Sequence, residues 1–337
     1  MKPHDGYKEP LASGNDRDGI SRRCALLVIS SALALTALPA SMARGAEAAR
    51  LRVRFTKGQV LRYVMTMRTN VNVTKDGNEL KQSMVNDTVF KWKVREVSPD
   101  GMATIEQVNE RSRLDLKNPG VNIQFDTAKP VNEKKQEFPS EFQALTDGLR
   151  NTIGKPITLT VDPRGEIQKI TFSREFLDAI GMSQEFMEFG FKRDKPLKRL
   201  GELGLTALPT KSLAVGESEE ESKSVDSPLA SEPVKYRFKY TRRPDERIAG
   251  RDAKRIDYSL DLNPASFNLG ATQYDVSGSI RLDVRRGVIT DIDLRRVLAV
   301  DLGQATGGLI KNNNKQVLTR TTRLLAAEED PFADQAK

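Results

Sequence analysis

The strict alternation of apolar and polar side chains over long stretches is the feature that most restricts how this chain can fold. The alternation runs from residue 51 onward and is clearest over residues 60–73. Successive side chains of a strand point to opposite faces, so this period predicts antiparallel strands with one buried and one exposed face. Residues 80–97 and 102–116 repeat the pattern and predict two more strands.

Short turn motifs separate these runs. Lys75-Asp76-Gly77-Asn78 follows the first run, and Ser98-Pro99-Asp100-Gly101 follows the second. Asp-Gly and Pro-Asp-Gly supply the backbone angles that hairpins need. The predicted strands exceed the usual five or six residues, which favours a long curved sheet or an open barrel over a small sandwich.

The middle of the chain has a different period. Residues 141–153 place apolar side chains on one helical face, residues 155–161 and 166–172 predict a hairpin, and Ser173 predicts the start of a second helix. Alternation resumes in five further runs, at residues 234–241, 253–262, 274–284, 288–302 and 316–325. The fold class predicted is mainly β, in an α+β arrangement, with helices inserted midway.

Composition divides the chain further. Residues 216–233 are acidic and rich in Ser, which predicts a linker or loop. This gives an N-terminal β half with central helices at 44–215, a C-terminal β half at 234–325, and a disordered tail at 326–337. The two halves are expected to share one sheet or to form two facing ones.

The first 43 residues have the pattern of a secretory signal peptide. A polar segment ends in Ser21-Arg22-Arg23, an apolar stretch covers residues 24–40, and Ser41-Met42-Ala43 offers a cleavage site. We expect export to the periplasm or beyond, by either the general or the twin-arginine route. The apolar stretch is too short to be preferred as a membrane span, so no stable span is expected after cleavage.

Cleavage there would remove the single histidine, His4, and the single cysteine, Cys24. The mature chain would then lack an imidazole base, a thiolate and His or Cys metal ligands. No catalytic motif occurs either, so we expect a protein that is not an enzyme and holds neither cofactor nor metal. Three features disfavour nucleic acid as a partner: export, the low aromatic content of 6%, and lysines and arginines that are scattered among acids.

Two neighbouring clusters are candidates for contact with lipid. Phe186, Met187, Phe189 and Phe191 recur at helical spacing and could line an apolar groove or face a membrane. A candidate basic patch follows directly, made of Lys192, Arg193, Lys195, Lys198 and Arg199. The alternative is a helix that packs on the core and ends in solvated cations, which suit a helix C-terminus.

Carboxylates are the remaining acid and base groups. Asp257, Asp261, Asp291 and Asp293 lie on predicted strands of the second half, and the last two share one strand face. Two carboxylates across a cleft could hydrolyse glycans. The alternative is that they face solvent beside basic neighbours such as Arg295, as polar residues of a half-exposed strand do.

Several segments carry a resemblance. The residues Phe55-Thr56-Lys57-Gly58-Gln59-Val60-Leu61-Arg62-Tyr63, the run from Lys155-Pro156 to Pro163-Arg164-Gly165, and Leu208-Pro209 before Val215-Gly216-Glu217 resemble a family of secreted bacterial β-rich proteins classed as a domain of unknown function. These motifs concern architecture only. At the level of fold, the chain is similar to half-barrels that carry lipoproteins or lipids across bacterial periplasms, which implies a lipid or lipoprotein-like ligand.

These observations leave three hypotheses. The first is a non-enzymatic exported protein that holds a hydrophobic or amphiphilic ligand, or an envelope partner, on a curved sheet. The second is an envelope scaffold or interaction module that uses a basic surface and exposed sheet edges. The third, a glycan hydrolase, requires two strand acids in an open cleft.

Overall fold

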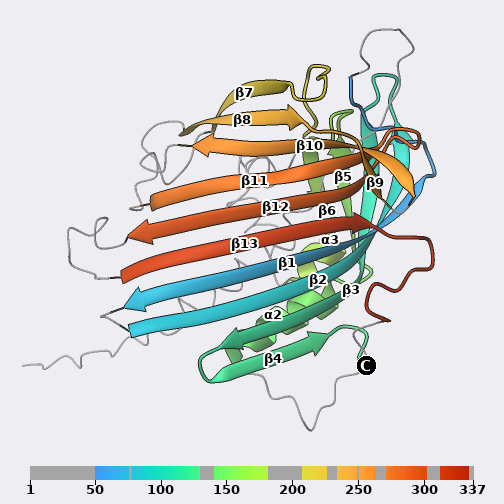
Figure 1. The fold of residues 1–337 in the computed structure, drawn as a ribbon. Coiled ribbons are helices and arrows are strands. Elements are labelled where there is room, and N and C mark those ends of the chain that lie inside the picture. The colour runs from blue at the N-terminus through green and yellow to red at the C-terminus, as the bar shows by residue number, and fades with distance from the viewer. Residues whose placement is uncertain are drawn as a thin grey trace, which may run out of the picture.

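The computed structural model describes residues 50–75, 78–129, 140–180, 207–225, 234–248, 250–262, 271–301 and 312–333. Within these ranges the chain is mainly β, with two short helices in its middle (Figure 1). The elements are β1 (Val60–Lys75), β2 (Asn78–Val97), β3 (Ala103–Asn118), β4 (Val121–Asp126), α2 (Ser140–Asn151), β5 (Pro156–Val161), β6 (Ile167–Phe172), α3 (Arg174–Ala179), β7 (Ser218–Val225), β8 (Val234–Arg242), β9 (Glu246–Ile248), β10 (Arg251–Leu262), β11 (Ala271–Asp283), β12 (Val288–Asp301) and β13 (Asn312–Leu324).

One antiparallel sheet of 13 strands contains all the described strands. Its order is β6-β5-β3-β2-β1-β13-β12-β11-β10-β8-β7, with β4 added to β3 and β9 added to β10. The first strand pairs with the last over 13 residues, from Tyr63 with Leu324 to Lys75 with Asn312. The N-terminal and C-terminal halves therefore share one sheet, which is the first of the two arrangements expected.

The sheet is bent at one end, here called the closed end, where the β5–β6 turn (162–166) and the β11–β12 turn (284–287) lie. Figure 1 shows β5 and β6 behind β10 to β13 at this end. Register shifts occur near it at Val94/Glu96, Thr160/Val161 and Arg281/Leu282. Such irregularities bend a strand and increase its twist, which accounts for the curvature.

Residues 51–55 bridge the two sides of the bent sheet at the closed end. The amide of Val53 donates to Pro163 O (3.3 Å) and that of Arg54 donates to Gly287 O (2.7 Å). Leu51, Val53 and Phe55 are buried. Gly287 has a φ of +65°, and a Cβ there would lie 2.4 Å from Arg54 Cγ, so the crossing needs glycine. The β5–β6 turn and the β11–β12 turn thus hold the same short segment.

Ion pairs join the two ends of the strand order, and we call this contact the seam. Arg164, in the β5–β6 turn, donates to both carboxylate oxygens of Glu221 on β7, at 3.2 and 2.8 Å. Lys223, also on β7, lies 3.0 Å from Glu166. The amide of Leu208 donates to Arg164 O (2.8 Å), which adds a third segment. These contacts hold the two edges of the sheet, the β5–β6 turn and β7, together at the closed end.

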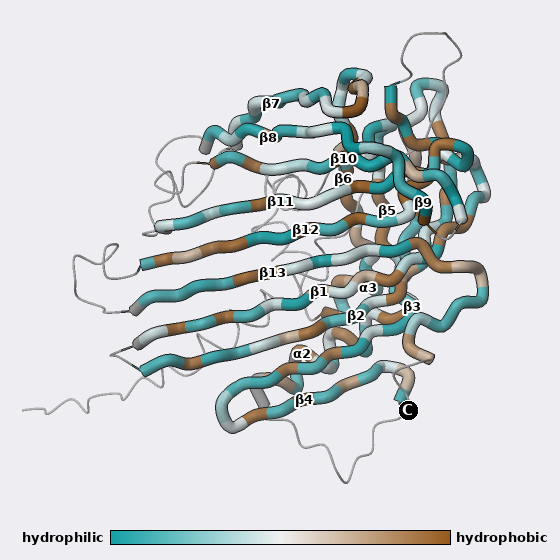
Figure 2. The backbone as a smooth tube through the Cα atoms, viewed as in Figure 1, coloured by the Kyte–Doolittle hydropathy of each residue, from teal (hydrophilic) through white to brown (hydrophobic). Residues whose placement is uncertain are grey.

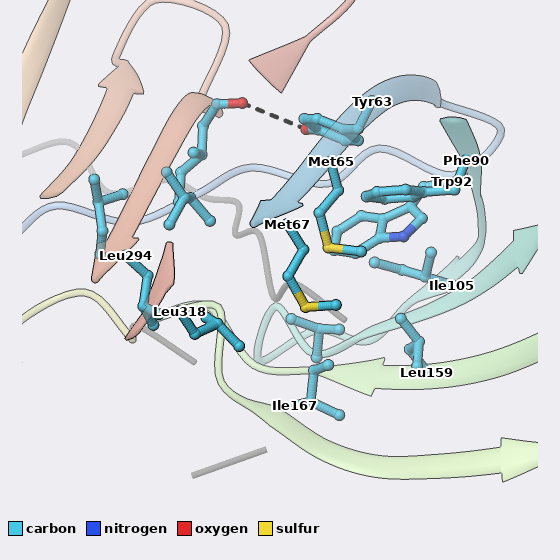
Figure 3. Packing of buried hydrophobic residues seen from close by; sticks show 14 of the residues in the cluster. Tyr63, Met65, Met67, Phe90, Trp92, Ile105, Leu159, Ile167, Leu294 and Leu318 are labelled. Atoms are coloured by element: carbon cyan, nitrogen blue, oxygen red, sulfur yellow. Dashed lines mark hydrogen bonds between the residues drawn. The ribbon is translucent and has the colours of Figure 1, made fainter. Parts of the chain in front are cut away.

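The largest buried side chains gather on the inner face of the sheet, near the closed end. Tyr63, Phe90 and Trp92 are fully buried and pack ring against ring, with centroids 5.6 to 6.2 Å apart. Trp92 Nε1 donates to Gln107 Oε1 (2.8 Å), so its polar atom is satisfied in the core. Figure 3 shows Met65 and Met67 between these rings and the side chains of Leu294 and Leu318.

The two helices form where the sequence predicts them. In α2, Leu145 and Leu149 are buried and Phe142 packs against the core, as the helical spacing predicts. In α3, Ser173 Oγ accepts from the Phe176 amide (3.1 Å) and caps the first turn.

The structure differs from the predictions in two of the segments expected to be irregular. Residues 218–225, part of the stretch expected to be a linker or loop, form β7. Its acids alternate, so Glu219 and Glu221 face inward to Thr210 and Arg164, and Glu220 faces outward to Arg237. Cations beside Glu220 and Glu221, and hydrogen-bond donors beside Glu219, offset the repulsion that an acidic run would otherwise suffer in a strand.

The tail expected to be disordered is held as far as residue 333. Phe332 is buried with Val64, Val89 and Leu325 in a small cluster on the outer face of the sheet. The guanidinium carbons of Arg111 and Arg113 each lie 4.8 Å from the centre of its ring. The segment is mostly polar, so its composition predicted disorder. One aromatic residue, Phe332, is what holds it to the sheet.

Candidate functional site

We call the end of the sheet opposite the turns the far end. There β1, β12 and β13 reach Lys75, Asp301 and Asn312, and the inner face is less buried than at the closed end. Inward residues of β1 and β12 here are still apolar but are no longer buried. They form, with one residue of β2, the far-end strip: Val71, Val73, Leu80, Leu298 and Val300.

The register places this strip beyond the core face in two parts, because the inward residues Gln316 and Asn314 of β13 lie between its β1 and β12 members. Val73 pairs with Leu80 across β1 and β2. Val71 and Leu298 pair with Gln316 of β13 from either side. Leu80 is 49% exposed, whereas Met84, four residues further in on β2, is 8% exposed. Figure 2 shows apolar segments extending along β1 and β12 to this end. A partly exposed apolar surface on a curved face can accept an apolar ligand.

A group of polar side chains lies on the inner face between the strip and the aromatic core. We call Asn86, Arg296, Arg320 and Thr322 the donor belt. Asn86 and Arg320 pair with Met67 from opposite sides, and Arg296 pairs with Leu318. Three of the four are almost fully buried, Asn86 at 1%, Thr322 at 2% and Arg320 at 3% exposed.

The belt contains polar atoms that their neighbours do not satisfy. Asn86 Oδ1 accepts from Thr88 Oγ1 (3.1 Å). Within the described ranges, Asn86 Nδ2, Thr322 Oγ1 and Arg296 Nε are buried without a hydrogen-bond partner. Buried polar groups normally find one, because leaving a donor unsatisfied costs free energy. Arg296 Nη2 donates to Gln316 Oε1 (3.4 Å).

Tyrosines line the β8 to β11 side of the belt. Tyr236, Phe238 and Tyr240 follow one face of β8, with centroids 5.6 and 5.9 Å apart. Tyr258 of β10 passes over Gly278 and donates to Asp293 O (2.9 Å). Burial raises the pKa of Tyr258 above its ordinary range, since an anion would be poorly solvated there. Tyr258 therefore stays neutral, and all four rings are buried on this side of the belt.

The four candidate acids lie on the outer face. Each alternates with core residues, as Asp291 and Asp293 do with Ile292, which is fully buried. Asp293 contacts Arg281 (2.5 Å), Asp257 contacts Arg255 (2.7 Å), and Asp261 contacts Arg237 (2.6 Å). Burial raises the pKa of Asp291, although Arg281 acts in the opposite direction. This placement does not provide the pair of inward carboxylates that glycan hydrolysis requires.

The lipid-contact candidates of the sequence cannot be compared with this geometry. Phe186, Met187, Phe189 and Phe191 lie outside the described residues, as do the basic patch at 192–199 and the signal peptide. In the part of the chain that the structure describes, no group of three or more His, Cys, Asp or Glu side chains could hold a metal ion. No helix there has both the length and the apolar character to cross a membrane.

The sequence analysis missed the donor belt, although its signal is present. Ile292, Leu294, Arg296 and Leu298 alternate along β12, so Arg296 falls on an otherwise apolar face. Arg320 carries a weaker signal, because the inward positions of β13 also include Asn314, Gln316 and Thr322. A cation at an inward position of a strand is a stronger indication of function than outward acids beside arginines.

Comparison with known proteins assigns no family. No protein-family model matches the chain, and no curated protein is found as a relative. Several solved structures show distant likeness. One is lipovitellin, from a study of lipid–protein interactions, with a TM-score of 0.39 and 11% identity over 82% of this chain. The match spans about a quarter of lipovitellin, covering 26% of that chain.

Two others come from bacteria. A β-barrel-like protein with a domain of unknown function from Brucella abortus matches with a TM-score of 0.17 and 10% identity, covering 82% of this chain and 97% of its own. A domain assigned as an outer membrane lipoprotein-sorting protein from Vibrio parahaemolyticus has a TM-score of 0.14 and 11% identity, covering 82% and 90%. These are remote likenesses of fold alone.

Proposed function

We propose that this chain is an exported, non-enzymatic binding protein that holds a hydrophobic or amphiphilic ligand on the inner face of its curved sheet. The observation that carries the proposal is the far-end strip. The face that buries Tyr63 and Trp92 at the closed end leaves Leu80 49% exposed at the far end. A ligand that covered the strip would gain about 25 cal/mol for each Å² of apolar surface removed from water.

The closed end supports the same proposal. Residues 51–55 and the seam hold the curvature there with backbone hydrogen bonds and ion pairs. A face that is curved before the ligand arrives loses less conformational freedom on binding, which favours affinity.

Native mass spectrometry of the purified full chain, followed by lipid extraction, tests the proposal. We expect co-purifying amphiphiles, and binding of the neutral fluorescent probe N-phenyl-1-naphthylamine. Leu298→Glu places a charge in the strip and should weaken probe binding at least 10-fold. Val60→Glu is the matched control, because Val60 is 55% exposed on the outer face. Absence of both co-purifying lipid and probe binding would contradict the proposal and favour the envelope scaffold.

A further inference from the structure

The donor belt gives the inner face a chemical preference beyond apolarity. All four members offer hydrogen-bond donors: the Asn86 amide, the Thr322 hydroxyl, and the guanidinium groups of Arg296 and Arg320. Two of the four carry positive charge. A face built to bury only hydrocarbon would place apolar side chains at these inward positions.

The strand register brings the belt together. Arg296 and Arg320 are diagonal neighbours on β12 and β13, since Arg296 pairs with Leu318. Diagonal neighbours have side chains starting about 7 to 8 Å apart, within reach for two arginines to converge on one group. Asn86 and Arg320 both pair with Met67, so two strand spacings of about 4.8 Å separate them.

The charge of Arg296 acts on the Arg320 guanidinium. Burial lowers the pKa of Arg320, and the charge of Arg296 lowers it further. Tyr258 acts in the opposite direction. Two cations on a face of low polarity repel each other, and an anion placed between them would relieve that repulsion.

The strip and the belt are continuous along the strands. Arg296 comes two residues before Leu298 on β12, and on β2 the inward positions run from Leu80 through Gln82 and Met84 to Asn86. A molecule lying along this face would therefore contact hydrocarbon at the far end and donors further in. A single amphiphile has the matching two parts, a hydrocarbon chain and a polar head group.

We infer that the ligand is an anionic amphiphile, whose carboxylate or phosphate head group is bound by Arg296, Arg320, Asn86 and Thr322 while its hydrocarbon chain covers the far-end strip. This inference rests on the proposed function and names its ligand class. Carboxylates and phosphates suit the site because both present several acceptor oxygens to arginine.

Competition against N-phenyl-1-naphthylamine tests the head group. Oleate and monooleoyl phosphatidic acid should displace the probe at concentrations at least 10-fold lower than oleyl alcohol, which has the same chain without a charge. In Arg296→Met this preference should fall to less than 3-fold, with affinity for oleyl alcohol retained. Arg295→Met is the matched control, because Arg295 is the adjacent residue and is exposed on the outer face. Thr322→Val, which replaces the hydroxyl with a methyl group of similar size, should also reduce the preference. This variant provides a second test if Arg296→Met does not fold.

The outcomes separate the two proposals. Equal affinity of the wild-type chain for oleate and oleyl alcohol would overturn the anionic head group and leave the apolar binding face standing. Failure of the probe and of every amphiphile to bind would overturn the proposed function itself. Inorganic phosphate alone should give no heat of binding at millimolar concentration in calorimetry. Binding of free phosphate at that level would indicate a site for a free anion and contradict the amphiphile.

Discussion

Arg164 and Glu221, 57 residues apart in sequence, form a two-bond ion pair that joins the opposite ends of the strand order. Their side chains are 14% and 22% exposed, so solvent screens the pair only in part. Burial acts to raise the pKa of Glu221, but the hydrogen bonds and charge of Arg164, aided by Lys223, lower it overall. The closed end of the sheet therefore depends on ionised side chains.

Glu221→Gln should destabilise the fold by about 1 to 3 kcal/mol at neutral pH, because a partly buried arginine loses its charged partner. Urea unfolding followed by the fluorescence of Trp92 measures this. Glu220→Gln is the control, since Glu220 faces outward and its partners Arg237 and Lys239 are each 52% exposed. Its effect should stay within about 0.5 kcal/mol. Equal losses in the two variants would argue against a stabilising seam.

The pH dependence of the same pair has a definite sign. The pKa of Glu221 in the folded chain lies below its ordinary value of 4.5. Its contribution to the free energy of unfolding is thus complete above that value and is lost as the pH falls below it. The difference in stability between the wild type and Glu221→Gln should shrink between pH 5 and more acidic values. A difference that stays constant across that range would contradict the assignment.

Gly278→Ala should be strongly destabilising. An added Cβ would lie 2.0 Å from Asp293 O and 2.4 Å from the Tyr258 hydroxyl, which breaks the hydrogen bond between them. We expect a loss of more than about 3 kcal/mol, within the range of overpacking combined with a lost buried partner. Gly148→Ala is the control, because its Cβ would meet nothing within 4 Å and Ala favours a helix. If Gly278→Ala left the free energy of unfolding unchanged, the position of the Tyr258 side chain over Gly278 would not be required for stability.

Phe332→Ala should release the C-terminal segment from the outer face. The ring packs with Val64 and Val89 and lies against Arg111 and Arg113. Truncation should cost about 3 kcal/mol and speed tryptic cleavage after Arg323. Glu328→Ala, at an exposed position of the same segment, should change neither. Unchanged proteolysis of Phe332→Ala would contradict an anchoring role for the ring.

The sequence predicts the architecture better than the site, for physical reasons. A period of two is a local property, so most long strands and both helices could be identified from it, and only their pairing required the structure. β7 was missed because its stability comes from Arg164 and Glu166, distant partners that composition does not show. The donor belt needs the register of β1, β2, β12 and β13, which no single strand reveals.

Photo-crosslinking can locate the ligand on the molecule. A fatty alcohol carrying a diazirine in mid-chain would be bound to the full chain, irradiated and mapped by peptide mass spectrometry. We expect labels on inward residues of the far-end strip, such as Val71, Leu80 and Leu298, with competition by unlabelled amphiphile. Saturable labelling confined to exposed outward residues such as Val60 or Arg68 would contradict binding on the inner face.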